Sequence, residues 1–268
     1  MYREHAPDAA LAPYVACFWT RREEEAGRRT MAVPEHRILP DGCIDLVFAF
    51  HPGATGGLAA AYAVGTMTRA LVVGGAARVA MLGVRFNPGG AAALLGCEAR
   101  ALTDLRVALR DAAPVLPDGT EDALHAADAS GRVATLARAL GRLLGGARPV
   151  DPLVAAATRW LQDGGGRARI ASLGDRLGVS RQHLARTFAR DVGVAPKTFA
   201  RVARLLAVVR DAKGASAPDW SRLAHAHGFA DQAHLVGDFH ALVGLTPARW
   251  AAARAAVPFL QAGRADTR

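Results

Sequence analysis

One segment in the last third of this sequence occurs twice, and this repeat constrains the fold more than any other feature. The matching pairs are Leu173 and Leu223, Gly178 and Gly228, Val179 and Phe229, His183 and His234, Leu184 and Leu235, Phe188 and Phe239, Val192 and Val243, Gly193 and Gly244, Pro196 and Pro247, and Phe199 and Trp250. A single inserted residue in a turn accounts for the change in offset from 50 to 51 residues. The repeat therefore predicts two supersecondary units of the same kind.

Each copy has the pattern of two helices separated by a tight turn. In the first copy, 170–177 is a short helical segment, Gly178 permits the turn, and Ser180 is a good N-cap for a helix over 180–190. Leu184 and Phe188 are four residues apart on that second helix, so both should face the core. The pattern predicts a helix–turn–helix unit.

The opposite face of the second helix carries polar groups suited to DNA. At 100° per residue it presents Gln182, Arg186, Ala189 and Arg190, and no carboxylate. Guanidinium and amide groups read guanine and adenine edges and bind phosphates, and the Ser180 end offers free N–H groups to a phosphate. A solvated basic face is the ordinary interpretation of a lone amphipathic helix, but the duplicated turn and the acid-poor face favour DNA binding here.

Residues 151–252 resemble an AraC-type transcription-regulator domain. The stretches that carry the resemblance are 173–188, 193–199 with Arg201 and Arg204, 227–235, and 239–247. The resemblance implies two helix–turn–helix units joined by a long helix, here about 196–212. It also implies two recognition helices that enter successive major grooves about one turn (~34 Å) apart.

The resemblance places the DNA-binding residues on the two recognition helices. On the first helix they are Ser180, Arg181, Gln182, Ala185, Arg186 and Arg190, with Gln182, Ala185 and Arg186 at the base-reading positions. On the second they are Gln232, Ala233 and His234, with Val236 and Gly237 on the same helix. Gly237 departs from the pattern, because many members carry a basic residue where it stands, and Asp231 and Asp238 add negative charge. We therefore predict that the first unit reads sequence and that the second mainly positions the protein.

Charge and hydropathy divide the chain in two. The net charge of +9 comes to +1 over 1–150 (16 basic, 15 acidic) and +8 over 151–268 (17 basic, 9 acidic). The first part has short alternating segments with turn signals, such as 43–50 after Asp41-Gly42, which predict strands. Further short strands are expected near 15–20, 37–39, 62–64, 71–73 and 78–86, and helices near 90–96, 119–128, 131–144 and 152–163.

These patterns predict an α+β protein. We expect a β-rich, barrel- or sandwich-like sensor or dimerisation domain with trailing helices over 1–148, and an all-α DNA-binding domain over 151–252. A tail over 253–268 follows. The stretches 39–48 and 82–90, with Tyr2 and Leu11-Ala-Pro-Tyr-Val15, resemble a β-rich sensor-like domain found ahead of some AraC-type domains. That resemblance carries no site residues, so the effector-binding residues stay unassigned.

The N-terminal half also contains groups that could bind or react. Asp45 and Cys43 are expected on one strand face, as a ligand-contacting pair or thiol sensor, although turn capping and a small core cysteine are the simpler interpretation. Arg85 could bind an anionic effector or pair with Asp45. The four histidines at 225, 227, 234 and 240 lack partners at metal-ligand spacing, so no metal and no cofactor are expected.

The sequence favours a DNA-binding transcription regulator over an enzyme. No nucleophile elbow, zinc-protease motif or phosphate loop is present, and no catalytic residue is assigned. The alternative is an enzyme of unknown reaction in the N-terminal half, with the helical half as a targeting module. Expected partners are double-stranded DNA, a small-molecule effector, a second copy in a homodimer, and RNA polymerase if the protein activates. The lack of a signal peptide, a membrane span and a disulfide pattern predicts a cytoplasmic protein.

Overall fold

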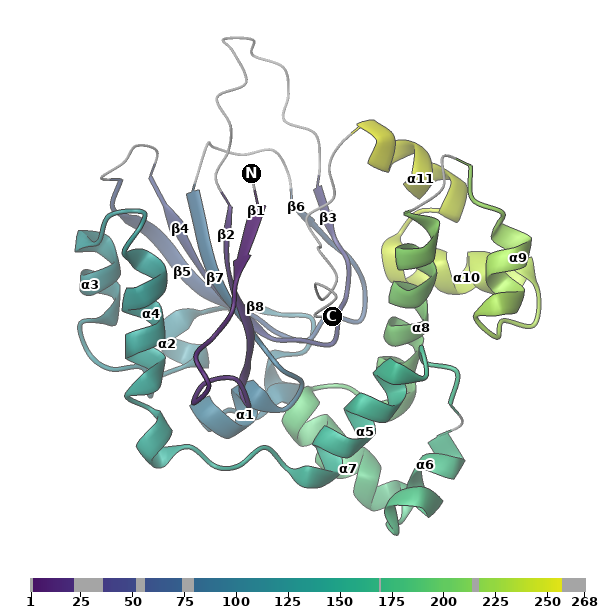
Figure 1. The fold of residues 1–268 in the computed structure, drawn as a ribbon, viewed down its shortest axis with the longest axis horizontal. Coiled ribbons are helices and arrows are strands. Elements are labelled where there is room, and N and C mark those ends of the chain that lie inside the picture. The colour runs from purple at the N-terminus through teal and green to yellow at the C-terminus, as the bar shows by residue number, and fades with distance from the viewer. Residues whose placement is uncertain are drawn as a thin grey trace.

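The computed structural model describes residues 2–21, 36–51, 56–73, 80–168, 170–213 and 217–256 (Figure 1). The N-terminal half contains a six-stranded antiparallel sheet with the order β1-β2-β7-β4-β5-β8 and a separate two-stranded ribbon, β3–β6. The strands are β1 (Tyr2–His5), β2 (Val15–Arg21), β3 (His36–Ile38), β4 (Asp45–Phe50), β5 (Leu58–Val64), β6 (Leu71–Val73), β7 (Ala80–Phe86) and β8 (Arg106–Ala108). The predicted α+β class is confirmed.

One face of the sheet forms an apolar core with short helices. Leu46, Phe48 and Phe50 alternate along β4 and are fully buried because that face packs against helices. Those helices contribute Leu124 and Leu136 to the same core, and Figure 1 shows α3 and α4 beside β5. The helical elements here are α1 (Gly90–Leu95), η1 (Ala99–Leu102), α2 (Leu109–Ala112), α3 (Thr120–Ala126), α4 (Arg132–Gly141) and η2 (Leu144–Gly146).

The start of β4 differs from the expected strand over 43–50. The strand begins at Asp45, while Asp41 accepts a hydrogen bond from the Cys43 N–H (3.0 Å) and Gly42 has a positive φ of 79°. An aspartate that binds the backbone two residues on makes a turn, so Cys43 lies in this turn. Cys43 therefore precedes the strand rather than lying in it, which corrects the expected start of the strand. Ile44 and Leu46 both belong to the apolar core, and Asp45 acts electrostatically on the Cys43 thiol, so Cys43 and Asp45 lie on the same, opposite side.

The C-terminal half is helical, and the repeat is visible in its structure. Its helices are α5 (Pro152–Asp163), α6 (Ile170–Leu177), α7 (Arg181–Val192), α8 (Pro196–Ala212), α9 (Trp220–Ala226), α10 (Gln232–Val243) and α11 (Pro247–Ala256). Two apolar clusters lie here, one around Phe188 and one around Phe239, and α8 contributes side chains to both. The predicted long helix over 196–212 is confirmed. The expected boundary between the halves stays a prediction, and most of the expected tail, 257–268, lies outside the described residues.

Part of the N-terminal half packs directly against the helical half. Leu39, just after β3, is 1% exposed and belongs to the cluster around Phe239. Gly42 lies against the ring of Phe199 on α8. Figure 1 shows the β3–β6 ribbon on the side of the sheet that faces the helical half. None of the described helices is long and apolar enough to cross a membrane.

Candidate DNA-binding surface

The second helix of the first unit, α7, is fixed at both ends by its own sequence. The Ser180 hydroxyl accepts a hydrogen bond from the His183 N–H (3.2 Å), and Gly193 ends the helix with a φ of 94°. Leu184 and Phe188 are 0% exposed, as their spacing predicted. The helix can turn only one remaining face to solvent, because these contacts fix its rotation about its axis.

Besides His183 and Arg190, that outward face carries three polar side chains. Arg181, Gln182 and Arg186 are exposed, and Ala185 is half-buried between them. Within the described part of the chain, none of these three polar side chains has a hydrogen-bond or ion-pair partner. A guanidinium has five donors and an amide has both donors and an acceptor, so these groups are available to a ligand.

Arg190, the fourth polar residue expected on this face, is already paired. Its guanidinium binds both carboxylate oxygens of Asp191 at 2.7 Å and reaches Asp151, the N-cap of α5, at 3.4 Å. The hydrogen bond to Asp191 raises the pKa of Arg190 above its usual range. The side chain keeps 47% of its surface exposed, but Asp191 and Asp151 offset its charge. Arg190 therefore contributes less free charge to the face than its sequence position implies.

The second unit repeats the skeleton of the first with a different outer face. Asp231 takes the N-cap role of Ser180 and accepts a hydrogen bond from the His234 N–H (2.7 Å). Gln232 and Ala233 are exposed, whereas the His234 ring packs edge-on against Phe229 at 5.3 Å between centroids. His234 is therefore partly committed to its own unit.

The middle of α10 offers no cation. Gly237 is exposed, and a Cβ built on it would have no atom within 4 Å. Asp238 accepts a hydrogen bond from Arg201 of α8 (2.7 Å), so its charge is neutralised locally. The outer face of the second unit therefore presents amide and imidazole groups rather than guanidinium groups.

A separate polar cluster lies on the sheet face opposite the apolar core. The Trp19 ring N–H donates to Asp45 (2.7 Å), and the Arg85 guanidinium lies 3.4 Å from Asp45 and 3.1 Å from Asp41. Of the two alternatives for Arg85, the structure therefore shows the pair with Asp45. Burial raises the pKa of the Asp45 carboxyl, although Arg85 and the Trp19 N–H lower it. Burial also raises the pKa of the Cys43 thiol, and Asp41 adds to that effect.

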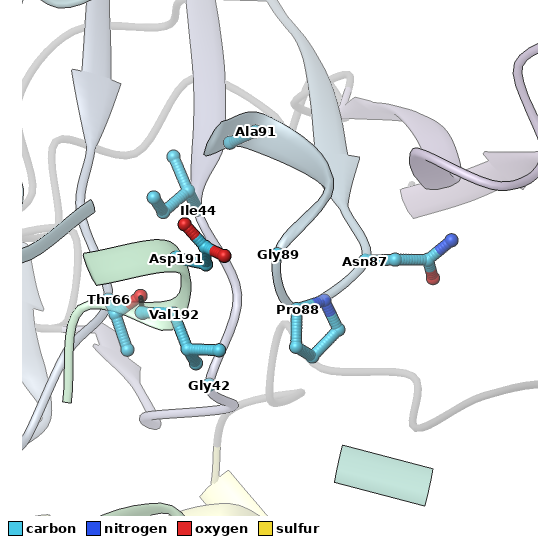
Figure 2. Close-up of a pocket in the computed structure, with 9 residues that line it drawn as sticks. All are labelled: Gly42, Ile44, Thr66, Asn87, Pro88, Gly89, Ala91, Asp191 and Val192. Carbon is cyan, nitrogen blue, oxygen red and sulfur yellow. Dashed lines mark hydrogen bonds between the residues drawn. The ribbon is translucent and has the colours of Figure 1, made fainter. Parts of the chain in front are cut away.

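A small hollow lies where the N-terminal half meets the end of α7 (Figure 2). It has essentially no room for even a water molecule, whereas small-molecule pockets typically enclose ~300–1,000 Å³. Its lining residues are Gly42, Ile44, Thr66, Asn87, Pro88, Gly89, Ala91, Asp191 and Val192. The hollow is a gap in the contact between the two halves rather than a room for an effector.

Two parts of the chain match known protein families. Residues 173–253 match a helix-turn-helix domain, and residues 3–108 match a domain of unknown function (DUF6597). No curated protein is significantly similar to this sequence.

Solved structures show weaker likenesses. One is the C-terminal domain of AraT, a response regulator from Geobacillus stearothermophilus, at 18% identity and a TM-score of 0.36, covering 44% of this chain and 94% of that chain. Another is ToxT from Vibrio cholerae, at 10% identity and a TM-score of 0.46, covering 87% and 97%. A further ToxT structure, bound to (E)-4-(8-methylnaphthalen-1-yl)but-3-enoic acid, has 10% identity and a TM-score of 0.45, covering 82% and 98%. TM-scores this low carry no argument about function.

Proposed function

We propose that this chain, whose residues 173–253 form an AraC-type helix–turn–helix domain, is a sequence-specific regulator of transcription that binds double-stranded DNA. The observation that supports this most directly is the outer face of α7. It holds Arg181, Gln182 and Arg186 exposed, with no partners among the described residues. DNA recognition by such a unit places this helix in the major groove.

Each exposed group on α7 has a distinct role in the proposed complex. Arg186 lies mid-helix and donates two hydrogen bonds to the O6 and N7 of a guanine, and Gln182 binds an adenine edge. Ala185 lets the helix approach the bases closely. Arg181 and the free N–H groups at the Ser180 end bind phosphate, and Arg190, held by Asp191, steers rather than reads.

In the second unit, Gln232, Ala233 and His234 contact the neighbouring groove. The amide of Gln232 reaches bases or phosphates, and His234 is held by Phe229 at a fixed angle. With Gly237 where the first unit has Arg186, this unit supplies position more than sequence discrimination.

The test is selection of bound fragments from genomic DNA by the purified chain, followed by fluorescence anisotropy on the selected duplex and on a scrambled one. Arg186→Ala should weaken specific binding by ~1–3 kcal/mol, about 5- to 150-fold, and leave scrambled DNA nearly unchanged. Arg138→Ala, an equal loss of charge at an exposed position of α4, is the matched control and should bind like the parent. If Arg186→Ala bound the selected and the scrambled duplex each as tightly as the parent does, the reading role of α7 would be refuted.

Control of DNA binding by a small-molecule effector of the N-terminal half is the second part of the proposal. Its support is the direct packing of this half against α7, α8 and α10. A thermal-shift screen should find a compound that raises the melting temperature and changes the affinity for the selected duplex. A stabilising compound that leaves DNA affinity unchanged would count against control. Formation of a homodimer, and contact with RNA polymerase if the protein activates, stay predictions.

One observation favours a second candidate function, an enzymatic reaction in the N-terminal half. Asp45 is a buried carboxyl with a raised pKa beside Arg85, and shifted groups of this kind are common in active sites. This candidate predicts that the purified chain consumes a metabolite with time and that Asp45→Asn abolishes the consumption, as measured by mass spectrometry. Sensing predicts saturable binding with no consumption.

A further inference from the structure

The end of the first recognition helix is held by the N-terminal half. The Thr66 hydroxyl donates to the Val192 carbonyl (2.5 Å), and the Thr103 hydroxyl donates to the Gly193 carbonyl (2.6 Å). Thr66 is 1% exposed, so its hydrogen bond is shielded from water. The last carbonyls of a helix have no partner within the helix, so these two donors complete the C-terminal end of α7.

The end of the second recognition helix is held in the same way. The Ala70 N–H donates to the Leu242 carbonyl (2.7 Å), and the Arg37 guanidinium reaches the Val243 carbonyl at 3.4 Å. Val243 is the repeat counterpart of Val192, so the N-terminal half contacts the same corner of both units.

Apart from the contact of Arg37 on β3, these contacts come from one cross-linked block of the N-terminal half. The Asp104 carboxylate accepts hydrogen bonds from the Thr68 N–H (2.7 Å) and hydroxyl (2.5 Å), and the Asp104 N–H donates to the Thr66 carbonyl (3.1 Å). Asp104 is the only non-glycine residue in the described ranges with a positive φ, 57°. That conformation is uncommon outside glycine, and the contacts on both sides of Asp104 hold it. Segments 66–70 and 103–104 are thus joined into one block, here called the crossbar.

Within the helical half, the two units have separate apolar cores. Phe199 and Ala200 of α8 belong to the first core, whereas Leu205 and Val208, further along the same helix, belong to the second. The covalent link between the units runs along α8, and Arg167, just before α6, also donates to the Ala226 carbonyl of α9 (3.3 Å). The crossbar is a further link, and it joins the C-terminal ends of the two recognition helices.

We propose that Thr66, Thr103 and Asp104 are positioning residues that fix the spacing and angle of the two recognition helices, so that both engage one DNA duplex together. This inference rests on the proposed DNA-binding function. Holding the second unit in place raises its effective concentration at the neighbouring groove, and a unit with few base contacts gains most from that effect. The role also explains why the N-terminal half contacts the C-terminal ends of α7 and α10 and leaves their reading face exposed.

The test compares two duplexes that share the selected site of the first unit. The short duplex ends after one groove, and the long duplex continues for one further turn of about 10 bp. The ratio of their dissociation constants measures what the second unit adds. The variant is full-length Thr66→Val/Thr103→Val, which removes both hydroxyl donors. Thr120→Val is the matched control, because Thr120 is also buried and donates to a carbonyl, that of Pro117 (2.5 Å), within the N-terminal half.

We expect the parent and Thr120→Val to bind the long duplex about 100-fold more tightly than the short one, within the range seen for linked sites. In the double valine variant this ratio should fall about tenfold. The variant should still bind the short duplex like the parent, because the reading face of α7 is intact. An unchanged ratio in the double valine variant would overturn the proposal.

Two further variants keep the test decisive. Thr66→Ser/Thr103→Ser retains both hydroxyls and should keep the parent ratio. If its ratio fell as far as that of the double valine variant, the effect would come from packing and the proposal would be overturned. If the double valine variant fails to fold, Thr103→Val alone should shift the ratio in the same direction by a smaller factor. Failure of the parent to prefer its selected duplex over scrambled DNA would refute the proposed function instead.

Discussion

The two helix–turn–helix units of this chain share a skeleton and differ in their outer face. Leu184 and Phe188 in the first unit, and Leu235 and Phe239 in the second, are all 0% exposed. Ser180 and Asp231 cap the recognition helices, and two glycines in the left-handed conformation end them. Where the first unit presents Arg186, the second presents Gly237. The comparison teaches that the fold depends on the buried and capping positions, while the proposed reading of DNA depends on the exposed positions, where the two units differ.

The units also differ in how the N-terminal half contacts their cores. Phe199 packs on Phe188 at 5.4 Å, and its counterpart Trp250 packs on Phe239 at 5.6 Å. Phe199 also lies against the Gly42 turn. The N-terminal half reaches the second core through Leu39 instead, so the first unit depends on the Gly42 turn and the second on Leu39.

The largest predicted effect tests that dependence. A Cβ on Gly42 would lie 2.4 Å from the Phe199 ring, and the φ of 79° is unfavourable for alanine. Gly42→Ala should lower the free energy of unfolding by ~2–5 kcal/mol, from backbone strain and steric overlap together. Gly119→Ala is the control, because its φ is 74° with no atom within 4 Å, and it should cost only ~1–2 kcal/mol. Urea denaturation measures both, and equal losses would show that the contact with Phe199 is unimportant.

The second prediction tests whether the two skeletons are equivalent. Ser180→Ala and Asp231→Ala each remove the side chain that accepts the N–H three residues on. Each should lower the free energy of unfolding by ~1 kcal/mol, since both are N-caps. Thermal melts of the two variants side by side give the result, and a negligible cost for one of them would break the equivalence.

The third prediction concerns the gap in the second unit's outer face. Gly237→Arg fills open space, improves helix propensity by up to ~1 kcal/mol, and adds a cation where the first unit has Arg186. We expect tighter DNA binding and a salt dependence, log K against log salt, that steepens by about one. Gly141→Arg on α4 adds the same charge in open space away from DNA, and an equal gain there would point to net charge alone.

The smallest predicted effect concerns the thiols of the N-terminal half, outside both units. Burial raises the pKa of Cys43 well above its usual range and that of Cys17 to about 12. At pH 8 both should be alkylated far more slowly than in denaturant, because the thiolate is the reactive form. The folded state holds the two thiol protons more tightly than the unfolded state does. The thiols therefore contribute fully to the free energy of unfolding below about pH 8.5, and this contribution falls at higher pH. Rapid labelling of folded Cys43, measured by peptide mass spectrometry, would support a thiol sensor.

Local patterns predicted most of the secondary structure. The alternation in 43–50 and 78–86 led to β4 and β7, and the turn residues around Gly178 and Gly193 marked the first unit. The short edge strands β1 and β8 were not predicted, because three or four residues carry too little periodicity. These strands form by pairing with β2 and β5.

The candidate DNA surface was predictable only where it depends on one helix. The exposure of Gln182 and Arg186 follows from the position of Leu184 and Phe188. The pairing of Arg190 with Asp151 does not follow, because those residues are 39 apart in sequence. The crossbar left no sequence signal either, since Thr66 and Val192 are 126 residues apart and a hydroxyl can bind any free carbonyl.

The central claim is that the first unit reads DNA sequence and the second mainly positions the protein. The most direct test measures the ratio of affinities for selected and scrambled duplexes at one salt concentration, for the parent, Arg186→Ala and Gly237→Ala. The account predicts that the ratio falls about tenfold or more in Arg186→Ala and changes less than about threefold in Gly237→Ala. A larger loss of discrimination in Gly237→Ala than in Arg186→Ala would contradict it.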